Sequence, residues 1–145
     1  MKISTKGRYA LRLMIDLAEH DNGGYTALKD ISARQKISLK YLEQIVIQLS
    51  KSGFLESVRG SQGGYRLAKK PSKYTAGDIL RVTEGTLAPV VCLETKTNKC
   101  ASYDKCSTVD FWHGLYDLIQ KYVDGITLED LVNKHIHKTS NEYSI

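Results

Sequence analysis

The sequence predicts a mainly α-helical protein with one small β-hairpin. Two observations favour this fold class. Apolar residues recur at intervals of three and four along much of the chain, as they do on the buried face of a helix. Residues 54–67 differ, because two short strand-like runs there flank a glycine-rich turn, which is typical of a hairpin. A chain of 145 residues, 41% hydrophobic and 26% charged, is long enough to fold around one core.

Composition and charge narrow the class of protein. No apolar run approaches the roughly 18 residues that a membrane span needs, and charged residues interrupt the first twenty positions, so we expect a cytoplasmic protein without a membrane segment. The net charge is +5, and it is unevenly spread. Residues 1–85 hold 15 lysines and arginines against 8 acidic residues, whereas residues 86–145 hold 6 against 8. The basic N-terminal part favours a polyanionic partner.

Two helices are expected before residue 36. The first covers residues 8–20 and stops before the paired glycines Gly23-Gly24, which accept left-handed backbone angles. The second covers about residues 27–35, with Thr26 as its N-cap.

A third helix is expected over residues 39–52, with Ser38 as its N-cap. Its buried face is predicted from four apolar residues at helical spacing: Leu42, Ile45, Val46 and Leu49. Its other face carries long polar side chains, among them Lys40, Glu43 and Gln44. Two short helices joined by a few residues indicate a helix-turn-helix, although a surface helix of any small bundle also has a polar face.

The hairpin directly behind these helices is predicted to be a wing. Its turn, residues 59–64, is longer and richer in glycine than a simple reversal needs, and Arg59 and Arg66 flank it. The third helix can enter the major groove of a duplex while such a wing reaches the backbone or the minor groove. An arginine suits the narrow minor groove because negative potential is concentrated there.

The rest of the chain is expected to form a fourth helix that supports the winged domain, a loop, and a helical C-terminal arm. A capping box at Thr75–Asp78 opens a fourth helix that ends at Gly85, which closes a winged helix-turn-helix domain of residues 1–85. Residues 86–106 show no periodicity and form a loop that contains all three cysteines. Residues 107–138 are predicted to be helical, and residues 139–145 a flexible tail.

The first helix of this arm is expected to join two copies of the chain. A capping box at Ser107–Asp110 begins it, and it carries a wide apolar stripe over about four turns. A winged domain of 85 residues does not need so long an apolar helix, so we interpret it as a dimerisation helix that packs against its twin. The alternative is that it folds back on its own domain. A shorter helix follows, capped at Thr127 and ending near residue 135.

The cysteines carry the obvious chemistry of the chain. Cys92, Cys100 and Cys106 lie within fifteen polar residues, with seven and then five residues between them. Thiolates prefer iron–sulfur clusters, zinc and copper(I), and the spacing does not match a zinc ribbon. A thiol redox switch is a further possibility, and small apolar packing is the plain alternative. No histidine lies near a nucleophile, and no phosphate loop is present, so we do not expect an enzyme.

Four segments resemble the bacterial winged-helix regulators that include IscR, NsrR and CymR. They are Met1 to Ala10, Ile37 to Gln44, Val58-Arg59-Gly60 with Gly63-Gly64-Tyr65, and Ala76 to Ile79. The resemblance implies a homodimeric, DNA-binding repressor or activator. It places the recognition helix at Ser38–Ser52, the wing at Arg59–Tyr65 and a dimer helix after the cysteines. Within the helix and the wing we expect the DNA contacts at Ser38, Lys40, Tyr41, Glu43, Gln44, Arg59, Ser61, Gln62, Gly63 and Gly64. Glu43 is expected to discriminate bases, and Arg59 to enter the minor groove.

The resemblance also bears on the cysteines. In cluster-binding members three cysteines of this loop hold a [2Fe–2S] or [4Fe–4S] cluster, which makes Cys92, Cys100 and Cys106 the expected ligands. The histidine that IscR-like members use as fourth ligand corresponds to Val109, and the aspartate of NsrR-like members to Arg8. The fourth ligand is therefore open, with these candidates: Glu94, Asp104, Asp110, His113 or a residue of the other subunit.

We accordingly expect a homodimeric repressor whose binding to a pseudo-palindromic operator is controlled by an iron–sulfur cluster. One alternative is a cluster-free CymR-like regulator of cysteine or sulfur metabolism that acts with a partner enzyme. Another is a zinc- or thiol-dependent interaction protein. A small redox enzyme would need a paired-thiol site on a βαβ background, which the sequence lacks.

Overall fold

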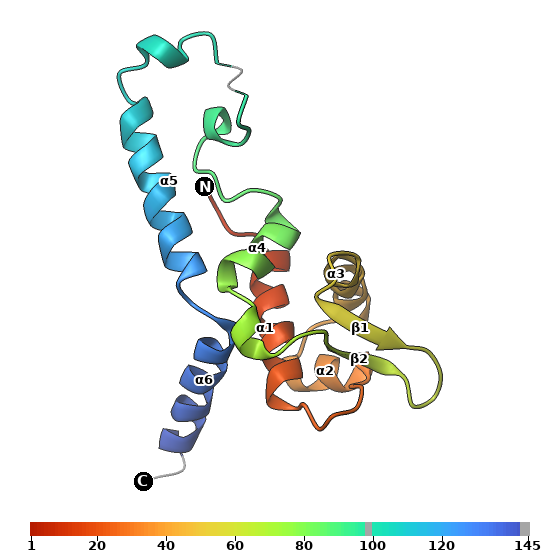
Figure 1. Ribbon diagram of the computed structural model, residues 1–145. Helices are drawn as coiled ribbons and strands as arrows, with labels where there is room; N and C mark the ends of the chain where they lie inside the picture. Colours follow the sequence, from red (N-terminus) through yellow and green to blue (C-terminus); the bar gives the residue numbers. More distant parts are fainter. Residues whose placement is uncertain (98–99, 143–145) are drawn as a thin grey trace.

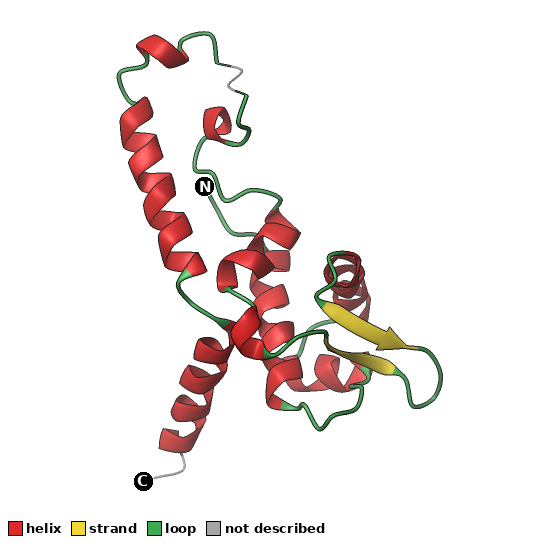
Figure 2. Ribbon diagram, in the orientation of Figure 1, coloured by secondary structure: helices red, strands yellow, loops and turns green. Residues whose placement is uncertain are grey.

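The computed structural model describes residues 1–97 and 100–142 and has the mainly helical architecture expected, with one two-stranded antiparallel hairpin (Figures 1 and 2). The elements in chain order are α1 (Thr5–Glu19), α2 (Leu28–Gln35), α3 (Leu39–Lys51), β1 (Leu55–Val58), β2 (Gly64–Leu67), the 3₁₀ turn η1 (Pro71–Lys73), α4 (Ala76–Glu84), the 3₁₀ turns η2 (Val91–Leu93) and η3 (Tyr103–Lys105), α5 (Val109–Asp124) and α6 (Leu128–Glu142).

The elements from α1 to α4 enclose one hydrophobic core. The predicted inward face of α3 is correct, since Leu42, Ile45, Val46 and Leu49 are all buried. They meet apolar side chains of α1, α2 and α4, among them Leu13, Met14, Ile31 and Ile79. Removing these side chains from water is the main favourable contribution to folding.

The helix starts follow local capping chemistry at three of the predicted positions. The Ser38 hydroxyl accepts a hydrogen bond from the Tyr41 N–H at 3.2 Å. Thr75 and Asp78 form the predicted capping box, and Thr127 forms another with Asp130. Each hydroxyl or carboxylate satisfies a backbone N–H that the first helical turn leaves without a partner.

Two predicted caps are wrong. Thr26 does not cap α2, because its backbone N–H and C=O pair with Tyr65 at 2.8 and 2.9 Å and hold the hairpin beside the α1–α2 loop. Ala27 is the N-cap residue instead. The capping box at Ser107 is also absent, since α5 starts after Thr108, whose side chain makes no cap bond.

The two helices of the C-terminal arm differ in how much of their surface packs on the head. None of the residues of α5 is buried. The helix starts next to the cysteine loop and runs towards the head (Figure 1). At its last turn Arg81 binds both carboxylate oxygens of Asp124 at 2.7 and 2.9 Å. In contrast, α6 packs on α1, and Leu128 is fully buried there. The helix α6 continues to Glu142, well beyond the expected end near residue 135 and into the segment expected to be a tail.

Candidate nucleic-acid interface and cysteine loop

The outward face of α3 is mainly polar and open to solvent, with Ile47 as an exposed apolar side chain on it. Lys40, Glu43 and Gln44 are exposed, and they lie on the side opposite the buried leucines and valine of the same helix. Tyr41 is partly buried, and its ring meets the ring of Tyr9 edge-on at 5.5 Å. Ser38 and Tyr41 therefore fix the start of the helix, while Lys40, Glu43 and Gln44 offer charged and amide groups of the kind that read base edges.

The hairpin lies beside α3 and presents its turn away from the core (Figure 1). Arg59, Ser61 and Gln62 are exposed in this turn. The two other predicted contact residues have a role within the hairpin. A Cβ on Gly63 would lie 2.2 Å from the Val58 carbonyl oxygen, and one on Gly64 would lie 2.1 Å from that of Thr26. These glycines are required by the packing of the wing itself.

The two arginines that flank the turn differ in their surroundings. Arg66 is held in place, since its Nε donates to Glu56 at 2.8 Å and its guanidinium lies over the Tyr25 ring at 4.5 Å. The hydrogen bond to Glu56 raises the pKa of Arg66 above its ordinary value. Arg59 makes no ion pair within the described part of the chain, so its charge is available to a ligand.

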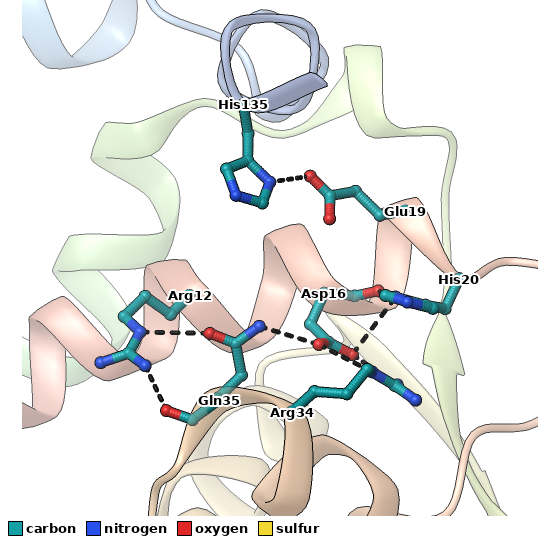
Figure 3. Close-up of polar contacts among 7 residues, drawn as sticks. All are labelled: Arg12, Asp16, Glu19, His20, Arg34, Gln35 and His135. Carbon is teal, nitrogen blue, oxygen red and sulfur yellow. Dashed lines mark hydrogen bonds and ion pairs between the residues drawn. The ribbon is translucent and has the colours of Figure 1, made fainter. Parts of the chain in front are cut away.

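A polar cluster that the sequence analysis missed joins α1 to α2 (Figure 3). Asp16 is completely buried, and it accepts hydrogen bonds from Arg34 Nε and Nη2 at 3.1 and 2.7 Å and from Gln35 Nε2 at 2.8 Å. The bond to Asp16 raises the pKa of Arg34. Because α3 begins only a few residues after Gln35, this cluster fixes the first helix of the helix-turn-helix relative to α1. One signal was present, since Asp16 falls on the apolar stripe between Leu13 and Leu17.

The cysteine loop connects α4 to α5 and stands apart from the winged head (Figure 1). Cys92 in η2 and Cys100 both line a cavity of 400 Å³, together with Val91, Glu94 and Thr95. Cys106 lies after η3, and its sulfur is 3.5 Å from Thr108 Oγ1. This contact lowers the pKa of Cys106 and favours the thiolate. Among the described residues no three metal-binding side chains converge on one point.

The candidate fourth ligands are not equivalent in position. Glu94 lines the same cavity as Cys92 and Cys100. His113 lies on α5 and its Nε2 is 2.5 Å from the Tyr103 hydroxyl, so this contact ties η3 to α5. Asp104 and Asp110 are exposed. Of the candidates, Glu94 is the one that shares a cavity with two of the cysteines.

Comparison with known proteins defines the family. Residues 3–134 match the family model Rrf2, which is described as an iron-dependent transcriptional regulator. The chain belongs to the Rrf2 family of transcriptional regulators. This Rrf2 protein is 42% identical over 133 residues to the HTH-type transcriptional regulator CymR of Bacillus subtilis, covering 92% of this chain and 91% of CymR. It is 39% identical to the regulator IscR of Pectobacterium atrosepticum, with coverage of 92% and 80%.

Solved structures agree with the Rrf2 assignment. The structure of CymR, the global cysteine regulator of B. subtilis, superposes with a TM-score of 0.75 at 40% identity and covers 92% of this chain and 98% of that one. That of T. potens IscR gives a TM-score of 0.70 at 37% identity, with coverage of 100% and 92%. The predicted winged-helix fold and the resemblance to this family are thus confirmed. Within the described residues, the helices are too short or too polar to span a membrane.

Proposed function

We propose that this Rrf2 protein is a homodimeric repressor that recognises its operator through α3 and the wing. The observation that supports the proposal is the placement of two unlike surfaces on one side of the head. The exposed polar side chains of α3 suit the base edges of the major groove, and Arg59 is exposed in the turn of the hairpin that packs on α3 and suits the minor groove. Ser61 and Gln62 of the same turn are suited to the sugar-phosphate backbone.

The surface of α5 supports the dimer. Phe111, Leu118 and Tyr122 are 65%, 67% and 70% exposed, which is unusual for large apolar side chains that recur along one helix. Leu118 and Tyr122 also line an apolar cavity of 410 Å³ with Ile3, Leu80 and Leu87. A second copy packed against this surface would bury these side chains and place two winged heads about a two-fold axis.

Selection of duplexes from a random pool tests this proposal directly. The protein is expected to enrich a pseudo-palindrome whose half-sites are about one or two helical turns apart, because a two-fold dimer presents two copies of α3. The logarithm of the affinity should fall linearly with the logarithm of the salt concentration, since bound lysines and arginines displace counterions from phosphates. Enrichment of single, unrepeated half-sites would contradict the dimer, and no enrichment would contradict sequence-specific binding.

We further propose that the cysteine loop holds an iron–sulfur cluster and that the cluster controls operator binding. The donor set supports this, because Cys92, Cys100 and Cys106 are soft ligands, two of them share one cavity, and the contact with Thr108 lowers the pKa of the third. When bound, the cluster would supply a centre that reacts with oxidants or other small molecules. The loop leads directly into α5. Loss of the cluster would therefore change the position of α5 and with it the relative positions of the two winged heads in the dimer.

Anaerobic purification is the test of the cluster. The protein should be coloured, with iron and inorganic sulfide in comparable amounts, and a serine at Cys92, Cys100 or Cys106 should remove both. Ser107→Ala is the matched control, since it changes a neighbouring residue that is not a soft ligand and should leave iron and sulfide unchanged. A colourless protein with bound zinc would contradict the cluster but not DNA binding.

A second candidate function has a specific observation in its favour. The CymR of B. subtilis, described as the global cysteine regulator of that organism, aligns with nearly the whole chain. Among the described residues the three cysteines do not converge with a further ligand. A metal-free protein that binds its operator fully would favour a CymR-like, cluster-free regulator that acts with a partner enzyme.

A further inference from the structure

A cavity of 340 Å³ lies between α1, α2 and α6, on elements that neither the DNA-binding surface nor the cysteine loop uses. Its walls include Arg12 and Ile15 of α1, Gln35 of α2, and Leu131, Lys134 and Lys138 of α6. This volume is at the lower end of small-molecule sites, which span roughly 300–1,000 Å³.

The side of α6 that faces α1 changes character along its length. Leu128 and Leu131 are apolar, and Leu128 is fully buried against the head. One turn further, at the same helical spacing, the positions are Lys134 and Lys138. The cavity therefore has an apolar base, formed by Ile15 and Leu131, and a positively charged rim, formed by Arg12, Lys134 and Lys138.

The acidic residues near this rim are already engaged. Glu19 of α1 is bound by His135 Nδ1 (Figure 3). Asp16 is buried and bound to Arg34 and Gln35. Asp130 uses its carboxylate in the capping box with Thr127. None of the ion pairs in the described part of the chain includes Lys134, Lys138 or Arg12, although the Asp130 carboxylate interacts electrostatically with Lys134, so the rim carries more positive charge than this one carboxylate offsets.

Arg12 is held in position at the opposite side of the cavity. Its Nε donates to Gln35 Oε1 at 3.2 Å and its Nη2 donates to the Gln35 backbone carbonyl (Figure 3). Its guanidinium also lies over the Tyr9 ring at 5.3 Å. These contacts leave Nη1 of Arg12 without a partner among the described residues. A fixed guanidinium of this kind binds a carboxylate with little loss of side-chain freedom.

We propose that this cavity is a binding site for a small organic carboxylate with a short apolar body. The carboxylate lies among Arg12, Lys134 and Lys138, and the apolar body lies on Ile15 and Leu131. Because the walls belong to α1, α2 and α6, the bound anion ties the C-terminal helix to the first helix of the helix-turn-helix. The site is separate from the cysteine loop and needs no cluster.

The probe for the test is para-fluorobenzoate, with para-fluorobenzamide as the uncharged molecule of nearly the same shape. Fluorine NMR of the full-length protein should show broadening of the carboxylate signal, reversed by unlabelled benzoate, and little broadening of the amide. Replacing both lysines by glutamine (Lys134→Gln with Lys138→Gln) should weaken binding at least about tenfold, because two charge-assisted contacts are lost. The control Lys121→Gln removes an exposed lysine of α5 and should change nothing.

Three results would overturn the site: no broadening at millimolar carboxylate, equal broadening of carboxylate and amide, or unchanged binding by the double variant. The double variant should also bind operator DNA as the wild type does when no carboxylate is present. A loss of DNA affinity in this variant would assign the lysines to phosphate contacts and overturn the anion site. The NMR titration uses no DNA, so its outcome is independent of the proposed function.

Discussion

Replacing Arg34 by methionine is expected to lower the free energy of unfolding by about 3 kcal/mol, as measured by urea denaturation. Asp16 is fully buried, and Arg34 supplies two of the three short hydrogen bonds that it accepts. Without the guanidinium the carboxylate stays in the core with the Gln35 amide at 2.8 Å and the more distant His20 imidazole at 3.7 Å as its remaining partners. An unpaired buried charge costs more than the pair contributes, so removal of one partner has a large effect.

Arg81→Met is the matched control. Arg81 also binds both oxygens of a carboxylate, at 2.7 and 2.9 Å, but Asp124 is 44% exposed rather than buried. Water can replace the lost guanidinium there, and the expected loss is no more than about 1 kcal/mol. Equal losses for the two variants would contradict the assignment of Asp16 as a buried charge that depends on Arg34.

The cluster of Asp16, Arg34 and Gln35 illustrates which features of the fold the sequence could predict and which it could not. The helix α3 was predicted with its cap and its buried face because both signals are local, a serine at the start and leucines at regular spacing. Asp16 lies on an equally regular stripe, but its partners come from the end of α2, eighteen and nineteen residues away. No local pattern identifies a donor at that distance, so the sequence shows that Asp16 falls on the apolar stripe but not which side chains satisfy its carboxylate.

The wrong cap at Thr26 has a related cause. Thr26 is a favourable N-cap residue by type, yet its backbone is already paired with Tyr65 of the wing. That pairing depends on the tertiary position of the hairpin, which outweighs the local preference. Gly63 and Gly64 have a packing requirement that the sequence does not reveal, since a Cβ on either would clash with the carbonyl oxygens of Val58 and Thr26, and their contact with DNA stays a prediction.

Replacing Arg59 by alanine is expected to weaken binding to the selected operator by about 1–3 kcal/mol, as measured in a gel-shift titration. Arg59 is exposed in the turn of the wing and makes no ion pair in the described residues, so its full charge is available to the minor groove. Loss of the side chain should also relax the preference for the base pairs that the wing covers, because a narrow groove binds a guanidinium most strongly.

Two further variants distinguish recognition by the planar guanidinium of Arg59 from simple attraction by its positive charge. Arg59→Lys keeps the charge but loses the planar guanidinium, so it should retain the salt dependence of the wild type and lose the sequence preference at the wing. Arg66→Lys changes the other wing arginine, which is already bound to Glu56 and stacked on Tyr25, and should leave the sequence preference intact. If Arg59→Ala bound the operator as tightly as the wild type, the wing would not contact DNA through this residue, and α3 alone would carry the recognition.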